Sequence, residues 1–552
     1  MKLLNELQSL LERVDWVLLA ATTAGLLASF LTTTAVYRIW FHPLSKIPGP
    51  KLAAATWLVE FYYNHIKQGQ YYKKIEEWHK VYGPVIRITP HEVHVNNPDT
   101  YSLLYKTNAK VTKDPLYYQR FAGDINVLFF AKDTATHRSR RDPLNNYFSK
   151  KSVTEFEAVI VKHIDRLCQH LKQHAESAPL GSQKPIDLHY RIRCIVLDIF
   201  SDYAFGKSFS FQDSPNLGKD FFDMIRVHMA SLWLFRMMTP SMVYRITHLP
   251  PFIALKLDPS ASTYVKLKQD SKVAIKKIRD DPKADDLRKE NRTVFYDMLH
   301  PHDDEGNPIP PKSLDDLSDE AYGLTVASSD TTGNGVHATL LGILSSPDVY
   351  AKLKDELRKA FPTPESKITW TKLEKIPYMV ACIKEGLRIS CGVIGRMPRI
   401  VEEPNFQVLG HHIPRGFSVT TSNYMMLRNP AIYEDPHDYK PGRWLDEDGN
   451  LHTHFDKYFV PFGKDSRHCI GMYLAQSELY LSVAHIVRRF DMKIAEDSHH
   501  QSVRDLDYID CFVSMARDVD KASLKVFVTP SDDYVTAESR LGEKNEEDLI
   551  AI

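Results

Sequence analysis

The sequence predicts a mainly α-helical chain with small β-sheets, attached to one N-terminal membrane-spanning helix. Residues 16–37 contain no charged side chain. Residues 150–270 read as mostly helical, and residues 376–389 place apolar side chains four, three and four positions apart, as an amphipathic helix does. Strand-like pieces are short, as at residues 85–88 and 93–95, which are separated by Pro90.

The uncharged stretch 16–37 is expected to be a membrane anchor. Its 22 residues span about 33 Å as a helix, which is enough for a bilayer core. A cleaved signal peptide is the alternative, but the apolar run is too long for one and shows no clear cleavage site. Lysine and arginine are slightly more frequent just after the span, which favours a cytoplasmic location for the rest of the chain.

Composition limits the classes of function. The chain has 552 residues, of which 43% are hydrophobic and 25% charged, so it can form a large globular core. Its formal net charge is zero, so nothing indicates a nucleic-acid partner. The six cysteines show no paired spacing, which fits a reducing compartment better than a disulfide scaffold.

The most informative stretch is residues 462–471. Cys469 has Arg467 two positions before it, Gly471 two after it and Phe462 seven before it, and an apolar helical run follows. This arrangement suits an iron held by one thiolate, because a tight loop entering a helix N-terminus offers N–H donors to an anion. The alternative is an ordinary buried thiol. The complete pattern within residues 462–471 argues against that alternative, because it recurs by chance in roughly one such chain in several thousand.

This stretch resembles the haem-ligand loop of the cytochrome P-450 superfamily, the haem-thiolate monooxygenases. The resemblance implies that Cys469 is the axial ligand of a haem b iron and that Arg467 pairs with a haem propionate. It also implies that Phe462 shields the sulfur from water and that Gly471 lets the helix lie flat against the porphyrin. Asp465 replaces the glycine usual in the family, and Asp is among the few residues that tolerate a turn with positive φ.

The second informative segment, residues 319–344, has apolar flanks around the polar residues 328–333. These are poor helix formers, so the segment is either a loop between two helices or a helix opened locally over a site. The central helix of the family carries an Ala-Gly-x-Asp/Glu-Thr-Thr/Ser motif at its oxygen pocket. Ser328 replaces the glycine, and the matching residues are Ala327, Asp330, Thr331 and Thr332. The resemblance implies that Asp330 and Thr331 organise protons for oxygen reduction.

Glu385 and Arg388 lie three positions apart on the helix predicted at 376–389. Such a pair is usually superficial and contributes a few tenths of a kcal/mol. In the family this pair is buried and is joined by an arginine from a later loop, which Arg443 matches. Gly442 stands where the family usually has glutamate. The resemblance therefore implies a buried triad of Glu385, Arg388 and Arg443.

Three further residues match partners of the haem propionates. His137 and Arg141 are four apart and share one face of a predicted helix, although a basic cluster is more often just a solvated surface. Arg399 lies in the turn that resembles the substrate side of the haem. The aromatic, irregular segment 111–130 occupies the position of the family's substrate-capping loop. The methionine-rich segment 224–242 is either core filler or the roof over the substrate.

The resemblance covers roughly residues 36–530 and implies one large, mostly helical domain with small antiparallel β-sheets. Three prolines and a glycine in residues 42–50 predict a stiff hinge. The polar, acidic C-terminus lacks a hydrophobic period, so a disordered tail is expected. The predicted parts are a short N-terminal segment (1–15), the anchor (16–37), the hinge (38–51), the monooxygenase domain (52–530) and the tail (531–552).

The implied reaction inserts one atom of dioxygen into a lipophilic small molecule, by hydroxylation, epoxidation or successive oxidation, and reduces the other atom to water. The hinge resembles that of filamentous-fungal members, which suggests a secondary-metabolite intermediate: a terpenoid, polyketide or alkaloid. The chain lacks a Gly-rich dinucleotide loop after a strand, so electrons are expected from a separate membrane-bound NADPH-dependent reductase. The expected location is the endoplasmic reticulum, as a single-pass protein whose catalytic domain faces the cytoplasm.

Two alternatives remain at this stage. A haem-thiolate isomerase or dehydratase rearranges a peroxide without a reductase, but such enzymes tend to lack the acid–alcohol pair seen here as Asp330 and Thr331. The second alternative is a non-catalytic haem sensor or carrier. The methionine and aromatic lining and the anchor argue weakly against it.

Overall fold

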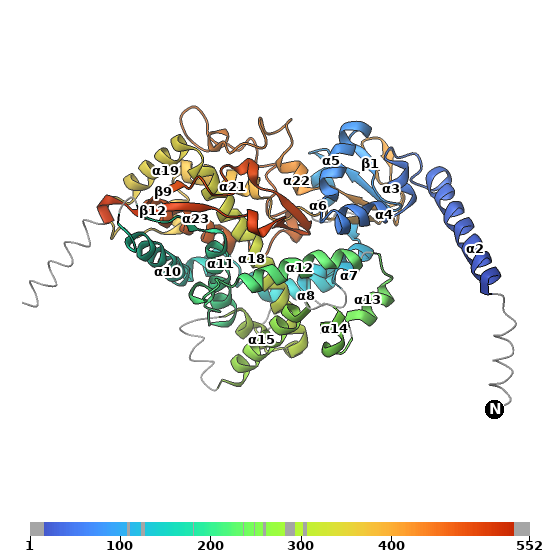
Figure 1. The fold of residues 1–552 in the computed structure, drawn as a ribbon, viewed down its shortest axis with the longest axis horizontal. Helices are drawn as coiled ribbons and strands as arrows, with labels where there is room; N and C mark the ends of the chain where they lie inside the picture. Colours follow the sequence, from blue (N-terminus) through green and yellow to red (C-terminus); the bar gives the residue numbers. More distant parts are fainter. Residues whose placement is uncertain are drawn as a thin grey trace, which may run out of the picture.

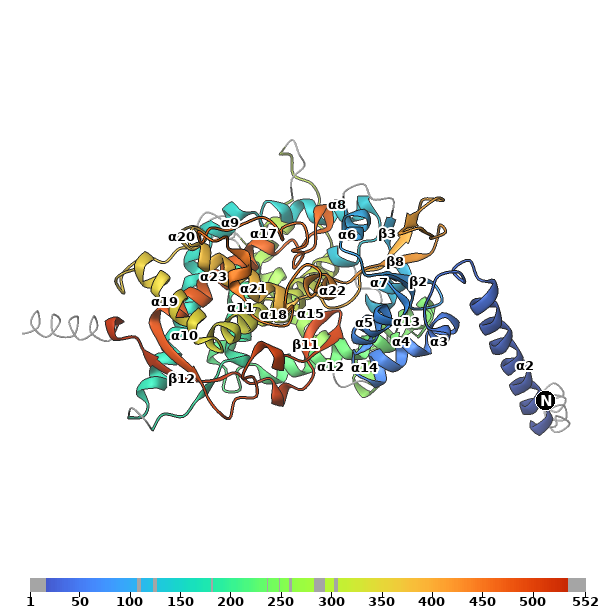
Figure 2. The same cartoon turned by 90° about the horizontal axis from the view of Figure 1, so that it is seen from above.

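The computed structural model describes residues 16–106, 111–122, 127–179, 182–235, 237–247, 249–257, 261–281, 293–301 and 306–534. Most of these residues form a helical body, beside which lies a smaller part built on a β-sheet (Figure 1). One helix projects from the side of the molecule that carries this sheet (Figures 1 and 2). The predicted class, mainly α with small antiparallel sheets and one N-terminal apolar helix, is confirmed. The predicted segment 1–15 lies outside the described residues.

The projecting helix is α2 (Trp16–Val36), which continues as the π-helix η1 (Tyr37–Phe41). Val17–Phe41 is the one helix in the described part of the chain that is long and apolar enough to cross a membrane, with a mean hydropathy of 1.6 and none of its apolar window buried. It runs four residues past the predicted end at residue 37, and the turn that begins at His42 and Pro43 stops it.

The centre of the helical body is α18 (Leu314–Leu344), a 31-residue helix that is buried over most of its length. It packs against α11 (His189–Phe205), α15 (Ala261–Asp280), α21 (Pro377–Ser390) and α23 (Met472–Arg489). The other α-helices are α3 (Lys51–Ala55), α4 (Leu58–Phe61), α5 (Tyr71–Tyr82), α6 (Thr100–Tyr105), α7 (Pro115–Ala122), α8 (Thr134–Asn145), α9 (Lys150–Glu155), α10 (Glu157–Glu176), α12 (Lys219–Phe235), α13 (Pro240–Thr247), α14 (Pro251–Leu257), α17 (Val294–Leu299), α19 (Pro347–Ala360), α20 (Trp370–Leu373) and α22 (Asn423–Leu427). The short helical turns are η2 (Tyr62–Ile66), η3 (Leu128–Phe130), η4 (Phe211–Asp213), η5 (Pro441–Trp444), η6 (Asp465–Arg467), η7 (Val503–Asp505) and η8 (Val519–Lys521).

The largest sheet has the strand order β1-β2-β8-β5-β3. Its strands are β1 (Val85–Arg87), β2 (Glu92–Val95), β3 (Val111–Lys113), β5 (Arg399–Val401) and β8 (Ser418–Thr420). All its pairings are antiparallel except the β2–β8 pair, which is parallel. The register places Lys113 opposite Arg399. The remaining strands are β4 (Ile186–Asp187), β12 (Lys525–Pro530) and β9 (Phe490–Ile494) in one sheet, and the hairpins β6 (Gln407–Val408) with β7 (His411–His412) and β10 (Tyr508–Cys511) with β11 (Val513–Ala516).

The segment 111–130, which was predicted to be irregular, contains β3, α7 and η3, so that prediction was wrong. Asp114 explains the helix, because its Oδ1 accepts hydrogen bonds from the N–H groups of Leu116 at 2.7 Å and Tyr117 at 3.2 Å. A carboxylate in this position caps a helix N-terminus and stabilises it. The aromatic content of the segment does not by itself predict this helix.

The polar residues 328–333 form part of one continuous helix, α18, so the alternative of a loop between two helices was wrong. The side chains that compete for backbone hydrogen bonds find acceptors in their own helix. Thr331 donates to the carbonyl of Ala327 at 2.6 Å, and Ser328 donates to the carbonyl of Thr325 at 3.0 Å. Such back-bonding lets hydroxyl side chains remain inside a helix.

The beginning of the predicted tail is attached to the body. Ser531 is buried, and its hydroxyl accepts a hydrogen bond from Lys354 Nζ at 3.0 Å. Asp533 pairs with the buried Arg488 at 2.5 Å. Residues 535–552, on which most of the predicted tail falls, lie outside the described residues.

Candidate active site

Cys469 lies in the wall of a cavity of about 900 Å³. All six cysteines of the chain lie in the described residues; Cys469 is exposed and the other five are buried. The cavity is bordered by α6, β3, α8, β5 and the loop before α23. Cys469 therefore differs from an ordinary structural thiol, because its sulfur faces a space large enough for a ligand.

The loop around Cys469 is tightly turned. Gly463 adopts a φ of +70°, a conformation that favours glycine, and the N–H of Cys469 donates to the carbonyl of Phe462 at 2.8 Å. The positive-φ turn expected at Asp465 is found at Gly463, and Asp465 begins the 3₁₀ helix η6. Although Cys469 is exposed to the cavity, desolvation by the surrounding walls raises the pKa of its thiol, whereas a hydrogen bond from the N–H of Gly471 lowers that pKa. A thiolate here would thus have a backbone donor at the start of α23.

Gly471 directly precedes α23 and faces open space. A Cβ atom built at this position would meet no atom within 4 Å. A flat ligand can therefore approach the backbone beside the Cys469 sulfur. This geometry fits a porphyrin whose iron is bound by the thiolate.

The same cavity has a strong excess of positive charge. Among the described residues, Asp142 is the one acidic residue in its lining, and the basic ones are Lys106, Lys113, Lys132, His137, Arg138, Arg141, Lys150, Arg399, Arg467 and His468. Like charges that are buried together destabilise one another unless an anion is bound. Burial and the nearby Arg399 lower the pKa of Arg467 to about 10. Burial and the cations around His137 lower its pKa to about 3, so its imidazole is neutral. The lining fits an anionic ligand such as the two propionates of haem.

Backbone carbonyls and one tyrosine hydroxyl accept hydrogen bonds from the arginines of the cavity and fix their positions. Arg141 donates to the carbonyl of His468 at 2.8 Å, and Arg467 donates to the carbonyl of Ala131 at 2.9 Å. Arg399 donates to the hydroxyl of Tyr118 at 3.0 Å. The structure thus brings Cys469 and the predicted propionate partners His137, Arg141, Arg399 and Arg467 to one cavity.

Lys113 is a cavity residue that the sequence analysis missed. It is 7% exposed and lies opposite Arg399 across β3 and β5. Burial lowers the pKa of Lys113 well below its usual range, and Arg399 and Arg467 lower it further. A single lysine in a three-residue strand gives no signal in the sequence, because only the pairing of distant strands places it at the cavity.

Asp330 and Thr331, although adjacent in sequence, face different neighbours. Thr331 faces the turn after α21: a Cβ atom added to Gly392 would lie 3.4 Å from the Cβ of Thr331. Asp330 is 7% exposed, and its Oδ1 accepts a hydrogen bond from Nε of Arg193 at 3.0 Å. No pattern in the sequence indicates Arg193, which lies on α11 and meets α18 only in the folded chain.

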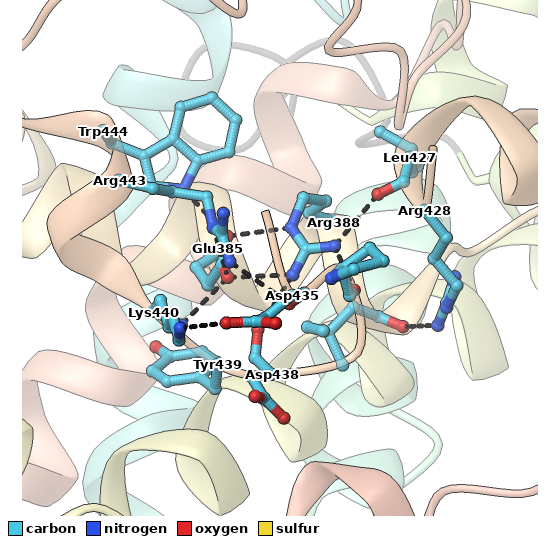
Figure 3. A network of polar contacts seen from close by, with 12 residues as sticks. Glu385, Arg388, Leu427, Arg428, Asp435, Asp438, Tyr439, Lys440, Arg443 and Trp444 are labelled. Carbon is cyan, nitrogen blue, oxygen red and sulfur yellow. Dashed lines mark hydrogen bonds and ion pairs between the residues drawn. The ribbon is translucent and has the colours of Figure 1, made fainter. Parts of the chain in front are cut away.

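Glu385, Arg388 and Arg443 form one network with Trp444 (Figure 3). Arg388 donates to both oxygens of Glu385 at 2.9 Å, and Arg443 Nε donates to Oε1 at 3.0 Å. Trp444 Nε1 donates to Oε2 at 3.0 Å, and the Lys440 N–H donates to Oε1 at 2.9 Å. The side chains of Glu385 and Arg388 are fully buried, and that of Arg443 is 7% exposed. The pKa of Glu385 is lowered, because these donors outweigh the effect of burial, which alone would raise it.

This network also joins α21 to the chain that follows it. Arg388 donates to the carbonyls of Leu427 at 3.0 Å and Pro436 at 2.6 Å, which joins α21 to the end of α22 and to the irregular segment before η5. An ion pair that satisfies so many backbone groups acts as a structural clamp.

Comparison with known proteins gives a consistent result. The Cytochrome P450 family model matches residues 48–509. N-acetyltryptophan 6-hydroxylase ivoC of Emericella nidulans is 32% identical over 482 residues, covering 87% of this chain and 91% of that protein. Conidiogenone synthase PchP450 of Penicillium rubens is 33% identical over 469 residues, covering 84% of this chain and 91% of that protein. The solved structure of retinoic acid-bound cyanobacterial CYP120A1 has a TM-score of 0.66 at 18% identity, covering 88% of this chain and 99% of that one.

Proposed function

The chain belongs to the cytochrome P-450 family, the haem-thiolate monooxygenases, and from this premise we propose that it oxidises a lipophilic intermediate of fungal secondary metabolism. The observation that supports this most is the position of Cys469 at the wall of a cation-lined cavity, beside the open face of Gly471. The proposed reaction is hydroxylation, epoxidation or successive oxidation at carbon. Electrons come from a separate NADPH-dependent reductase.

In the proposed site, Cys469 holds the haem iron through its sulfur, and haem supplies the activation of dioxygen. The N–H of Gly471 stabilises the thiolate, and the half-buried Phe462 limits the access of water to it. Arg141, Arg399 and Arg467 neutralise the propionates, and the neutral imidazole of His137 donates a hydrogen bond to one of them. Lys113 joins them, because it is buried in the same wall, where its ammonium donates to the Phe129 carbonyl and has no carboxylate partner among the described lining residues.

Asp330 and Thr331 manage protons in this proposal. The Cβ of Thr331 faces Gly392, at the turn that follows the clamp helix α21, and its hydroxyl donates to the Ala327 carbonyl in this structure. That hydroxyl can hold a water molecule near the oxygen pocket, and Asp330 exchanges protons with that water. Protons that reach the correct oxygen atom yield product and water, whereas misplaced protons release hydrogen peroxide.

The substrate class rests on an apolar cluster formed by α7, α12, α18 and the β10–β11 hairpin. It includes Tyr117, Met229, Trp233, Val326 and Phe512, all buried. Part of the methionine-rich segment thus packs in a cluster with aromatic residues. An apolar surface of this kind would favour contact with a lipophilic ligand. Two relatives are named N-acetyltryptophan 6-hydroxylase and conidiogenone synthase, and these names support a small organic substrate, for which we propose a terpenoid, polyketide or alkaloid intermediate.

We further propose that α2 anchors the protein in the endoplasmic reticulum, with the domain facing the cytoplasm. The apolar helix Val17–Phe41 with no buried surface supports this, as does the requirement for a membrane-bound reductase. The chain should remain in the membrane pellet after carbonate extraction, with its original N-terminus. A soluble chain that begins after residue 37 would contradict the proposal.

The decisive experiment combines the purified protein with a haemoprotein reductase, NADPH and a panel of lipophilic metabolites under isotopically labelled dioxygen. A product that gains one labelled oxygen atom, only when reductase and NADPH are present, supports the monooxygenase. Turnover of a lipid peroxide without the reductase would favour an isomerase or dehydratase. Haem binding without oxygen consumption would favour a sensor or carrier.

A further inference from the structure

The side chain of Arg193 lies across α18 in a cradle formed by three residues of that helix. Asp330 and Asn334 are four positions apart and therefore project from the same face. Gly333 lies between them, and a Cβ atom there would approach Cγ of Arg193 to 3.1 Å. Glycine at 333 thus leaves room for the Arg193 stem, which a larger side chain would displace.

The guanidinium is held at each of its three nitrogens. Arg193 Nε donates to Asp330 Oδ1 at 3.0 Å, and Nη2 donates to Asn334 Oδ1 at 2.6 Å. Nη1 donates to the carbonyl of His189, one turn earlier on α11, at 3.1 Å. Arg193 is 3% exposed and Asn334 2% exposed. The direction of the Asp330 carboxylate is therefore set by an arginine whose own position is fixed.

Asn334 connects this assembly to a third element. Its Nδ2 donates to the backbone carbonyl of Ser514 at 2.7 Å, in strand β11 of the β10–β11 hairpin. The tip of the hairpin is Phe512, which belongs to the apolar cluster and contacts Phe129 edge-on at 4.8 Å between ring centroids. One asparagine thus joins the arginine that holds Asp330 to the hairpin that borders the apolar cluster.

We propose that Arg193 and Asn334 are positioning residues that couple the β10–β11 hairpin to Asp330. A ligand that shifts the hairpin moves the Ser514 carbonyl, and Asn334 transmits that shift to Arg193 and the Asp330 carboxylate. Contact of a ligand with the hairpin tip thereby sets when Asp330 is aligned for proton delivery. This inference rests on the proton-delivery role proposed above for Asp330.

Asn334→Asp separates the two contacts of Asn334. It keeps an oxygen that accepts from Arg193 and loses the N–H that donates to Ser514. Asn334→Ala loses both contacts. Thr339→Val is the matched control, because Thr339 is buried on the same helix and its hydroxyl donates only within that helix, to the Gly335 carbonyl at 2.7 Å.

The first measurement is hydrogen exchange of the hairpin amides in the substrate-free holoenzyme. Loss of one hydrogen bond that restrains a segment should raise its exchange on the order of fivefold. We expect this increase over residues 508–516 in both Asn334 variants and not in Thr339→Val. Unchanged exchange in Asn334→Asp and Asn334→Ala would overturn the coupling.

The second measurement needs no organic substrate. Reduction of dioxygen to hydrogen peroxide takes two electrons and two protons, whereas reduction to two water molecules takes four of each, all electrons being supplied by NADPH through the reductase. We expect a larger share of the consumed NADPH to appear as peroxide in Asn334→Asp, Asn334→Ala and Arg193→Lys than in wild type and Thr339→Val. A lysine cannot bind Asp330 and Asn334 at once.

The two measurements fail in distinguishable ways. Faster exchange with an unchanged peroxide share would show that the tether is purely structural, which contradicts the inference but not the proposed function. A wild-type holoenzyme that consumes no oxygen with reductase and NADPH would contradict the proposed function and this inference with it. Purified variants that retain the wild-type haem spectrum serve for both measurements.

Discussion

Lys113 and Arg399 lie opposite each other across the antiparallel strands β3 and β5, in the wall of the cavity that contains Cys469. Like charges directly opposite in a sheet are destabilising. Burial and the neighbouring arginines lower the pKa of Lys113. An anion between the two cations relieves this repulsion, so the pair indicates a site that is completed by its ligand.

Lys113→Met should therefore have opposite effects on the two forms of the protein. The haem-free protein should become more stable to urea, because a buried charge next to Arg399 is removed. The holoprotein should lose haem roughly 10- to 100-fold faster, because a hydrogen bond to a charged group contributes about 1.5–3 kcal/mol. Haem transfer to an acceptor protein measures the second effect. Equal haem loss in variant and wild type would show that Lys113 does not contact the ligand.

Glu385→Ala tests the clamp. Removal of Glu385 leaves Arg388 buried and unpaired, which costs roughly 3–5 kcal/mol. We expect little or no haem in the purified variant and a lower melting temperature. Lys359→Ala is the control, because the exposed Lys359–Asp355 pair, at 2.7 Å, contributes at most about 1 kcal/mol. Full haem loading with unchanged melting would show that the network is dispensable.

Thr331→Ala should separate NADPH consumption from product formation. The variant keeps the contacts of Cys469 and should bind haem normally. Positioned proton transfer contributes roughly 10²–10⁴-fold to a step, so most NADPH should yield peroxide. Thr325→Ala is the control, because Thr325 makes the same type of bond, to the Ala321 carbonyl at 2.7 Å, deeper in α18. Equal coupling in both variants would remove Thr331 from the mechanism.

Asp510 should make stability depend on pH. Its burial in the β10–β11 hairpin raises its pKa to about 7, against about 3.9 in the unfolded chain. The folded protein therefore favours the protonated form, and stability is lost as pH rises from about 4 to 7. Asp510→Asn keeps the acceptor for the Phe512 N–H, which lies at 2.8 Å from Oδ1 in wild type. Urea unfolding should show a stability gain for the variant that grows with pH to on the order of 4 kcal/mol. A difference in unfolding free energy between variant and wild type that stays constant from pH 4 to 7 would contradict the raised pKa of Asp510.

Part of the site is predictable from the sequence because its geometry is local. Phe462, Arg467, Cys469 and Gly471 lie within ten residues of one another, and one loop and one helix start bring them together. Pairs such as Glu385 and Arg388 follow from helical spacing. The contact of Arg443 with Glu385 does not follow from local spacing, and only the resemblance to the family's motif predicted it.

The rest depends on contacts between distant elements. Lys113 reaches the cavity only through the pairing of β3 with β5, two strands that are distant in sequence. The Thr112–Glu402 hydrogen bond beside this pairing joins residues that are 290 positions apart. Arg193 meets Asp330 across 137 residues, and Asn334 meets Ser514 across 180. No spacing rule in the sequence indicates these pairs, because helix packing and strand register determine them.

The central claim is that Cys469 is the thiolate ligand of the haem iron. Its most direct test is the absorption spectrum of the reduced protein with carbon monoxide, for wild type, Cys469→Ser and the buried control Cys168→Ser. The account predicts the strongly red-shifted Soret band of a thiolate-bound haem in wild type and Cys168→Ser, and its loss in Cys469→Ser. Retention of that band in Cys469→Ser would contradict the account.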